Sequence, residues 1–250
     1  MPHDAAPPRL LTQNRRLRAI GVHNWTLPAW AGRLPDGRTY STCPSAGVCR
    51  QVCYARHGTY TWPVVRARHQ ANLALVLDDL TGWETRMIAE LGHRRFAAGA
   101  WVRIHDAGDF FSDDYLTAWL RVCRARPAVT FYTYTKEIDR FRRLVEPDPP
   151  PNLRWVYSLG GTQDEAIDLV ADRVADVFPD EAAITDAGWH SQSSSDLHAV
   201  QGPRLVGIPA NRIPSAVNRM NRRRFSEWQA ESGTGHLRTV PTDSAEREAA

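Results

Sequence analysis

Three short runs decide the fold: WVRIH at residues 101–105, VTFYTYT at 129–135 and LRWVYS at 153–158. Each run is rich in β-branched and aromatic residues, which favour strands. The runs recur about every 25 to 30 residues along the chain. Segments with helical spacing of apolar residues lie between them, and this alternation is typical of βα units with parallel strands. We therefore expect an α/β fold with a parallel sheet.

Two segments carry the three-to-four-residue spacing of apolar side chains that predicts a helix, residues 114–124 and 162–177. Ser112 or Asp113 can cap the first helix, because short polar side chains accept hydrogen bonds from the free N–H groups of a first turn. A further strand is expected at AAIT, residues 182–185. The pattern thus continues beyond the three strands that define the fold.

The composition fits one folded domain with polar ends. The 250 residues are 42% hydrophobic and carry a net charge of +3, which by itself does not indicate a nucleic-acid partner. No apolar run approaches the roughly 18 residues of a membrane span, and the first residues lack a secretory signal, so we expect a cytoplasmic protein without a membrane partner. The expected organisation is an arm at 1–18, an α/β domain at 19–190, a basic extension at 191–231 and a tail at 232–250.

Polar residues stand where the three strands end, and carboxyl ends of parallel strands are where such folds place their chemistry. Arg103, His105 and Asp109 belong to the first end, Lys136 to the second and Ser158 to the third. Lys136 is the single lysine of the chain, which suggests a site that needs a compact amine rather than a guanidinium. We take Lys136, Asp109 and His105 as catalytic candidates. The alternatives are a helix-capping Asp109, an interior His105 and a Lys136 that begins a helix.

Three cysteines lie within eleven residues as Cys43, Cys49 and Cys53, a C-x5-C-x3-C pattern. In a reducing compartment such spacing favours metal binding over disulfides. Thiolates suit both zinc and iron–sulfur clusters. His57 can complete a zinc site of the type C-x5-C-x3-C-x3-H, whereas Cys123, as a fourth thiolate, competes with its interpretation as a core residue. We favour an iron–sulfur centre.

A dense basic stretch near the C-terminus contains Arg222, Arg223 and Arg224. Clustered arginines can follow a phosphate backbone, so nucleic acid is a candidate partner. The alternative is a solvated, arginine-rich helix.

The runs TCPSAGVCRQVCYARHGTY, RIHDAGDFFSDDYL and FYTYTKE together resemble the phage gene-product-88-like domain family of actinobacteria and their phages. The resemblance covers roughly residues 20 to 190. The layout is also similar to radical S-adenosylmethionine enzymes, in which a three-cysteine loop follows the first strand of an incomplete (β/α) barrel. The cysteine spacing here is wider than the C-x3-C-x2-C of most such enzymes.

The second resemblance implies an incomplete (β/α) barrel of radical S-adenosylmethionine type with the cysteine cluster loop near its N-terminus. It also implies a [4Fe–4S] cluster on the three cysteines, S-adenosylmethionine bound nearby, an external reductant and a substrate, small or macromolecular, that the sequence does not identify. The leading hypothesis is thus an iron–sulfur enzyme. A zinc-stabilised nucleic-acid-binding protein and a non-catalytic iron–sulfur protein are the alternatives. The expected cofactor-binding residues are Arg103, Gly108, Asp109, Lys136, Ser158, Gly160 and Gly161.

Overall fold

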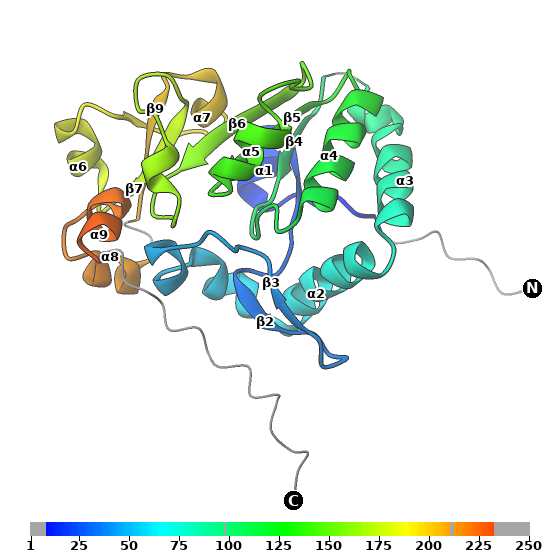
Figure 1. Ribbon diagram of the computed structural model, residues 1–250, viewed down its shortest axis with the longest axis horizontal. Helices are drawn as coiled ribbons and strands as arrows, with labels where there is room; N and C mark the ends of the chain where they lie inside the picture. The colour runs from blue at the N-terminus through cyan, green and yellow to red at the C-terminus, as the bar shows by residue number, and fades with distance from the viewer. Residues whose placement is uncertain (1–8, 98, 211–212, 233–250) are drawn as a thin grey trace, which may run out of the picture.

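A computed structural model describes residues 9–97, 99–210 and 213–232 (Figure 1). Its centre is a seven-stranded sheet in which every paired neighbour is parallel. The strand order is β1 (Val22–Trp25), β4 (Trp101–Ile104), β5 (Thr130–Thr135), β6 (Leu153–Ser158), β7 (Val174–Phe178), β9 (Leu205–Pro209) and β8 (His190–Ser191). The predicted α/β class is confirmed, and the three strands that defined it lie side by side.

Helices cover both faces of this sheet. On one face, Trp83 of α3 (Leu80–Leu91), Trp119 of α4 (Asp113–Ala125) and Phe141 of α5 (Ile138–Leu144) belong to the core that also contains Val102 and Phe131. On the other face, α1 (Arg15–Ala19) and α7 (His198–Gln201) pack on side chains of the central strands, which are Tyr132, Val156 and Ala175. Alternate residues of β5 and β6 therefore face different helices, as the period of a strand requires.

The incomplete barrel of radical S-adenosylmethionine type is not confirmed. Within the described residues β1 and β8 are the edges of an open sheet. The face that a barrel would turn inward is filled by α1 and α7, whose Leu17 and Val200 are buried.

Two sequence predictions beyond β6 are wrong. Residues 162–177, expected to be a helix, contain only the short 3-10 helix η5 (Asp164–Ala166) before β7 begins. Val170 of the supposed apolar face is 76% exposed, whereas Val174 and Phe178 are buried in the sheet between β6 and β9. The expected strand at 182–185 lies inside α6 (Glu181–Asp186), because Asp180 accepts a hydrogen bond from the Ala183 N–H and caps a helix there.

The long insertion between β1 and β4 builds a layer at the carboxyl edge of the sheet, below it in Figure 1. It holds a two-stranded sheet, three short 3-10 helices and a long helix, with α3 and η4 (Arg94–Phe96) after it. These elements are β2 (Ala31–Arg33), β3 (Thr39–Ser41), η1 (Val48–Gln51), η2 (Tyr54–Arg56), η3 (Gly58–Thr61) and α2 (Pro63–Asp78). We call residues 30–70 of this layer the cap.

The last described helices, α8 (Pro214–Met220) and α9 (Phe225–Glu231), pack against the cap. Met220, Phe225 and Trp228 share an apolar cluster with Val48 and Val52 of the cysteine segment. No helix within the described ranges is long and apolar enough to cross a bilayer.

The predicted boundaries at residues 18, 190 and 231 stay predictions, and structured elements cross them. Leu10 and Leu11 are buried and α1 follows them, all within or across the predicted arm. β9 lies in the predicted extension and pairs with β7. Most of the predicted tail lies outside the described residues.

Candidate functional site

Lys136 follows β5 and is 8% exposed. Its ammonium donates to the carbonyl and the hydroxyl of Ser158 at 2.9 and 2.8 Å and to the Leu159 carbonyl at 2.5 Å. Three acceptors therefore meet the three N–H donors of one compact ammonium, which a planar guanidinium cannot reproduce in the same space. The structure thus gives a physical reason for the single lysine: it fixes the carboxyl end of β6 to that of β5.

Asp109 lies beside Lys136 but does not bind its ammonium. Its carboxylate accepts from the Phe110 N–H, the Thr135 hydroxyl and the Lys136 backbone N–H, each at 2.8 Å. Burial, and next the nearby Glu137 carboxylate, raise the pKa of Asp109 to about 7. Asp109 therefore joins the loop after β4 to the end of β5.

The Gly160–Gly161 turn after β6 is the surface on which the cysteine segment docks. The Gly160 carbonyl accepts from the Cys49 N–H at 3.2 Å, and the Ser45 carbonyl accepts from the Thr162 N–H at 2.9 Å. A Cβ on Gly161 would lie 2.9 Å from the Ser45 carbonyl oxygen, so only glycine permits this approach.

Two carboxylates that the sequence analysis did not select complete this docking. Glu137 accepts from the Ser45 N–H at 2.9 Å, and Asp164 accepts from the N–H groups of Gly160 and Gly161, both at 2.8 Å. Their positions directly after Lys136 and shortly after the two glycines were the available signal. The predicted Lys136, Asp109, Ser158, Gly160 and Gly161 thus lie in one connected network, and that network holds the cysteine segment in place.

Arg103 takes part in a separate polar cluster on the face of the sheet that carries α1 and α7. Its guanidinium donates to Asp196 at 3.2 Å, lies 3.5 Å from the Asp106 carboxylate and stacks on the Tyr134 ring at 5.0 Å. The Tyr54 hydroxyl donates to the Asp106 carbonyl, and the Arg103 guanidinium donates to that hydroxyl at 3.4 Å. This cluster anchors the residue that follows the third cysteine to the end of β4.

Residues 103 and 105 would lie on the same face of the sheet if the strand continued through both, but His105 does not lie on the face of Arg103. The strand ends at Ile104, and a φ of +64° turns the His105 ring into the core. There its Nε2 lies 2.8 Å from the Tyr115 hydroxyl, and its ring packs on Phe110. Burial lowers the pKa of His105 to about 3, so the ring is neutral at physiological pH. Gly108 follows with a φ of +87°, packed against Leu27.

The structure does not support the metal centre predicted at Cys43, Cys49 and Cys53. The three thiols lie near one another, since Cys49 contributes to the raised pKa of both neighbours. Nevertheless, no group of three or more His, Cys, Asp or Glu side chains in the described ranges is arranged to hold a metal ion. Backbone contacts hold this segment in its shape: the Cys49 N–H donates to the Gly160 carbonyl and the Ser45 N–H to the Glu137 carboxylate. Burial, above all, raises the pKa of Cys43 and brings that of Cys53 to about 12, so both thiols are neutral at physiological pH.

The other two candidate ligands are also placed by the structure. His57 is exposed and ends η2, so it is held by local backbone geometry. Cys123 is fully buried on α4 in the core with Trp119, as its core interpretation expected.

Two of the three arginines predicted to contact phosphate are engaged with carboxylates. Arg223 pairs with Glu231 at 2.5 Å, and Arg224 lies 3.1 Å from Glu227 and 3.7 Å from Asp176. Arg222 is exposed and makes no ion pair with a described residue. This stretch therefore offers one available cation rather than three.

The cap, in contrast, has arginines without acidic partners. Residues 30–70 contain six arginines and a single acidic residue, Asp36. Asp36 pairs with Arg38, which also binds Asp78. The other five arginines of residues 30–70 make no ion pair with a described residue, and they are Arg33, Arg50, Arg56, Arg66 and Arg68.

Aromatic rings lie among these cap arginines. The Arg56 guanidinium stacks on the Trp30 ring at 5.0 Å, and Arg56 and Arg66 both oppose the rise that burial causes in the pKa of Tyr40. Trp62 is 58% exposed and Tyr54 is 44% exposed. The cap thus presents positive charge and aromatic surface together.

Arg219 of α8 donates to the Gln51 carbonyl at 3.1 Å and adds a further exposed cation beside η1. From here on we use the name cap arginines for Arg33, Arg50, Arg56 and Arg66 of the cap together with Arg219, which lies beside it. Arg68 is not included, because its guanidinium donates to the carbonyls of Arg9 and Leu10.

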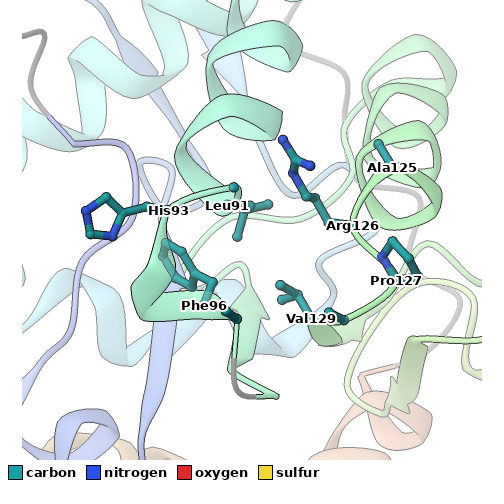
Figure 2. A pocket seen from close by; sticks show the side chains of 10 residues that line it. Leu91, His93, Phe96, Ala125, Arg126, Pro127 and Val129 are labelled. Carbon is teal, nitrogen blue, oxygen red and sulfur yellow. The ribbon is translucent and has the colours of Figure 1, made fainter.

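The described chain also has two small hollows. One, of about 210 Å³, lies at the amino-terminal edge of the sheet between the segments that lead into β4 and β5, and Figure 2 shows Phe96, Arg126 and Val129 around it. The other, of about 200 Å³, lies beside the β6 end between Asp164, Trp189 and Arg224. The first is at the edge opposite to the predicted site residues.

Fold and site together define an α/β protein with an open parallel sheet whose carboxyl edge carries a docked, arginine-rich cap. The chain belongs to the Gene product 88 family, whose model matches residues 9–234. It is similar to the Gene 88 protein of Mycobacterium phage L5, with 40% identity over 110 residues, and to that of Mycobacterium phage D29, with 37% over 110 residues. Each match covers 41% of this chain and less than half of the relative, 46% and 45%. No solved structure matches.

These comparisons confirm the predicted phage gene-product-88-like family but not the resemblance to radical S-adenosylmethionine enzymes. The predicted function, a radical S-adenosylmethionine-like iron–sulfur enzyme or a zinc-stabilised module, is wrong. The chain belongs to the Gene product 88 family and not to the radical S-adenosylmethionine enzymes, and the described residues hold no metal-binding group. Binding of a [4Fe–4S] cluster, S-adenosylmethionine or zinc to the chain stays a prediction.

Proposed function

We propose that this member of the Gene product 88 family binds nucleic acid through the cap arginines. The observation that supports the proposal is that these five arginines make no ion pair with any residue in the described ranges, although the chain as a whole has a net charge of only +3. The arginines of α4 and α5 are, in contrast, all neutralised by ion pairs, for example Arg121 by Glu84 and Arg142 by Asp172.

Several guanidinium groups without carboxylate partners are costly to gather in one layer unless an anion meets them, because like charges repel one another. A nucleic-acid backbone supplies such anions at regular spacing, and arginine binds phosphate oxygens through two parallel N–H groups. The predicted contact through Arg222 extends the same surface, since Arg222 follows α8, which carries Arg219. The proposal requires no metal and keeps the predicted cytoplasmic location.

The cap holds these side chains on a fixed support. The cysteine segment docks on the Gly160–Gly161 turn, and Tyr54 is anchored to the end of β4. Arginines on a fixed support lose less conformational entropy on binding than arginines on a free tail. In this proposal the network of Lys136, Asp109 and Glu137 positions the binding surface and does not contact the partner.

The experiment is the salt dependence of binding to labelled oligonucleotides of about 20 nucleotides, measured by fluorescence anisotropy for a single strand and a duplex. If all five cap arginines meet phosphates, the logarithm of the binding constant falls against the logarithm of salt with a slope of about −3.5 for a single strand and about −4.5 for a duplex. The double variant Arg56→Gln, Arg66→Gln then lowers the magnitude of the single-strand slope by about 1.4.

Arg94→Gln is the matched control, because Arg94 is exposed on η4 directly before β4 and far along the sheet from the cap. It removes one positive charge outside the cap and should leave the slope unchanged. Binding that ignores salt, or an equal effect of the cap and control variants, would contradict the proposal.

A further inference from the structure

The aromatic residues of the cap deepen the proposed function, and the inference rests on it. We infer that the nucleic acid is single-stranded and that its bases stack on Trp62 and Tyr54. The observation that supports this is a short run in which Tyr54 and Arg56 on η2, Trp62 directly before α2 and Arg66 on the first turn of α2 follow one another along the chain. Successive aromatic rings and cations are the arrangement that single strands need, since each base brings one flat face and one phosphate.

Tyr54 is built as a rigid platform. Its hydroxyl is bound at the Asp106 carbonyl and by Arg103, whereas the residue as a whole is 44% exposed. The ring of Tyr60 packs edge-on against it with centroids 5.7 Å apart. The hydroxyl of Tyr54 is fixed while the residue remains partly exposed to solvent. Such a ring can stack on a base with little further loss of rotational freedom.

Trp62 is the most exposed tryptophan among the described residues. It is 58% exposed, precedes Pro63 and contributes its backbone to the start of α2, where its carbonyl accepts from the Arg66 N–H at 2.9 Å. Trp62 thus lies one helical turn before Arg66, an arginine that pairs with no acidic residue in the part of the chain that the structure describes. An exposed indole of this kind contributes to the free energy of binding when a flat partner covers it.

A duplex cannot use these rings, because its bases already stack on one another and present only their edges in the grooves. Phosphate contacts alone would therefore make single and double strands similar partners. The exposed rings make the single strand the better one, and they are indifferent to sequence because every base has a flat face.

The test compares three labelled 20-nucleotide probes at 0.1 M salt: a single strand, its duplex and an abasic strand with the same backbone but without bases. DNA and RNA versions of the single strand distinguish the two sources of the same chemistry. Trp62→Ala should weaken binding of the base-bearing strand about tenfold and leave the duplex and the abasic strand unchanged. Trp62→Phe should restore part of the loss.

Val170→Ala is the matched control, since Val170 is a 76% exposed apolar residue after η5 and outside the cap. It should change none of the three affinities, and a thermal melt should show that both alanine variants fold. Equal binding of all three probes, or an unchanged affinity of Trp62→Ala for the base-bearing strand, would overturn the inference and leave the proposed function standing. Absence of salt-dependent binding to every probe would instead remove the proposed function.

Discussion

Replacing Lys136 by methionine removes the ammonium while it keeps most of the side-chain volume. The three hydrogen bonds to Ser158 and Leu159 are charge-assisted, and such bonds contribute roughly 1.5–3 kcal/mol each before the cost of burying the ammonium is subtracted. Methionine also leaves the two backbone carbonyls without this donor. We expect Lys136→Met to lower the free energy of unfolding by roughly 3 kcal/mol, which for a chain of this size lowers the melting temperature by roughly 6–12 °C.

The assay is urea unfolding followed by circular dichroism, together with the rate at which a thiol reagent labels the cysteines. The second measurement is local: Lys136 fixes the β6 end, and the Gly160 carbonyl beyond it holds the Cys49 N–H. Loss of the ammonium should therefore speed labelling of the cysteine segment more than the global loss of stability requires.

Arg154→Met serves as the control, because Arg154 is an exposed cation of the same strand β6. It should change the free energy of unfolding by less than about 0.5 kcal/mol. If Lys136→Met were as stable as this control, Lys136 would not fix the two strand ends together as described.

Two further predictions concern the same network. Because the pKa of Asp109 is raised to about 7, the folded chain keeps this proton between about pH 4 and 7 while the unfolded chain loses it, so its contribution to stability is full below about pH 4 and falls as the pH rises to 7. The free energy of unfolding of Asp109→Asn relative to that of the unmodified chain, measured in urea titrations, should accordingly increase over that window by up to about 1.4 kcal/mol per pH unit. A difference that does not change with pH would refute the assignment. The lowered pKa of His105 gives the opposite trend, but it does so in both proteins and therefore cancels in the difference. Gly161→Ala should destabilise the chain by roughly 1–3 kcal/mol, because its Cβ would approach the Ser45 carbonyl to 2.9 Å, and a melt indistinguishable from that of the unmodified chain would show that the docked segment can move aside.

Local pattern predicted the part of the fold in which strand and helix signals agree with burial. Strands β4, β5 and β6 and the helix α4 lie within a residue or two of their expected positions, because their β-branched, aromatic and amphipathic patterns also match what the core requires. After β6 the signals diverge. The spacing of Ile167 and Val170 imitates a helix although Val170 faces solvent.

The candidate site was predicted in its members but not in its meaning. Polar residues at the strand ends do converge, since parallel strands place their carboxyl ends together. What they meet is a distant segment, through contacts such as that of Ser45 with Glu137, and no local pattern reports a contact across 92 residues. The excess of arginine over acidic residues in the cap can be counted in the sequence. The net charge of the whole chain does not reveal it, because acidic residues elsewhere balance these arginines.

The position of the cap between β1 and β4 also affects how the chain is made. Val22 pairs with Trp101, so the first strand of the main sheet has no parallel neighbour until the whole insertion has been synthesised. At about 5–20 residues per second the ribosome needs roughly 4–16 seconds for this interval. During that time Val22 and Trp25, fully buried in the finished protein, are exposed on the nascent chain. Two side chains of the finished core therefore wait several seconds for the strand that pairs with β1, and during this interval they are available for non-native contacts.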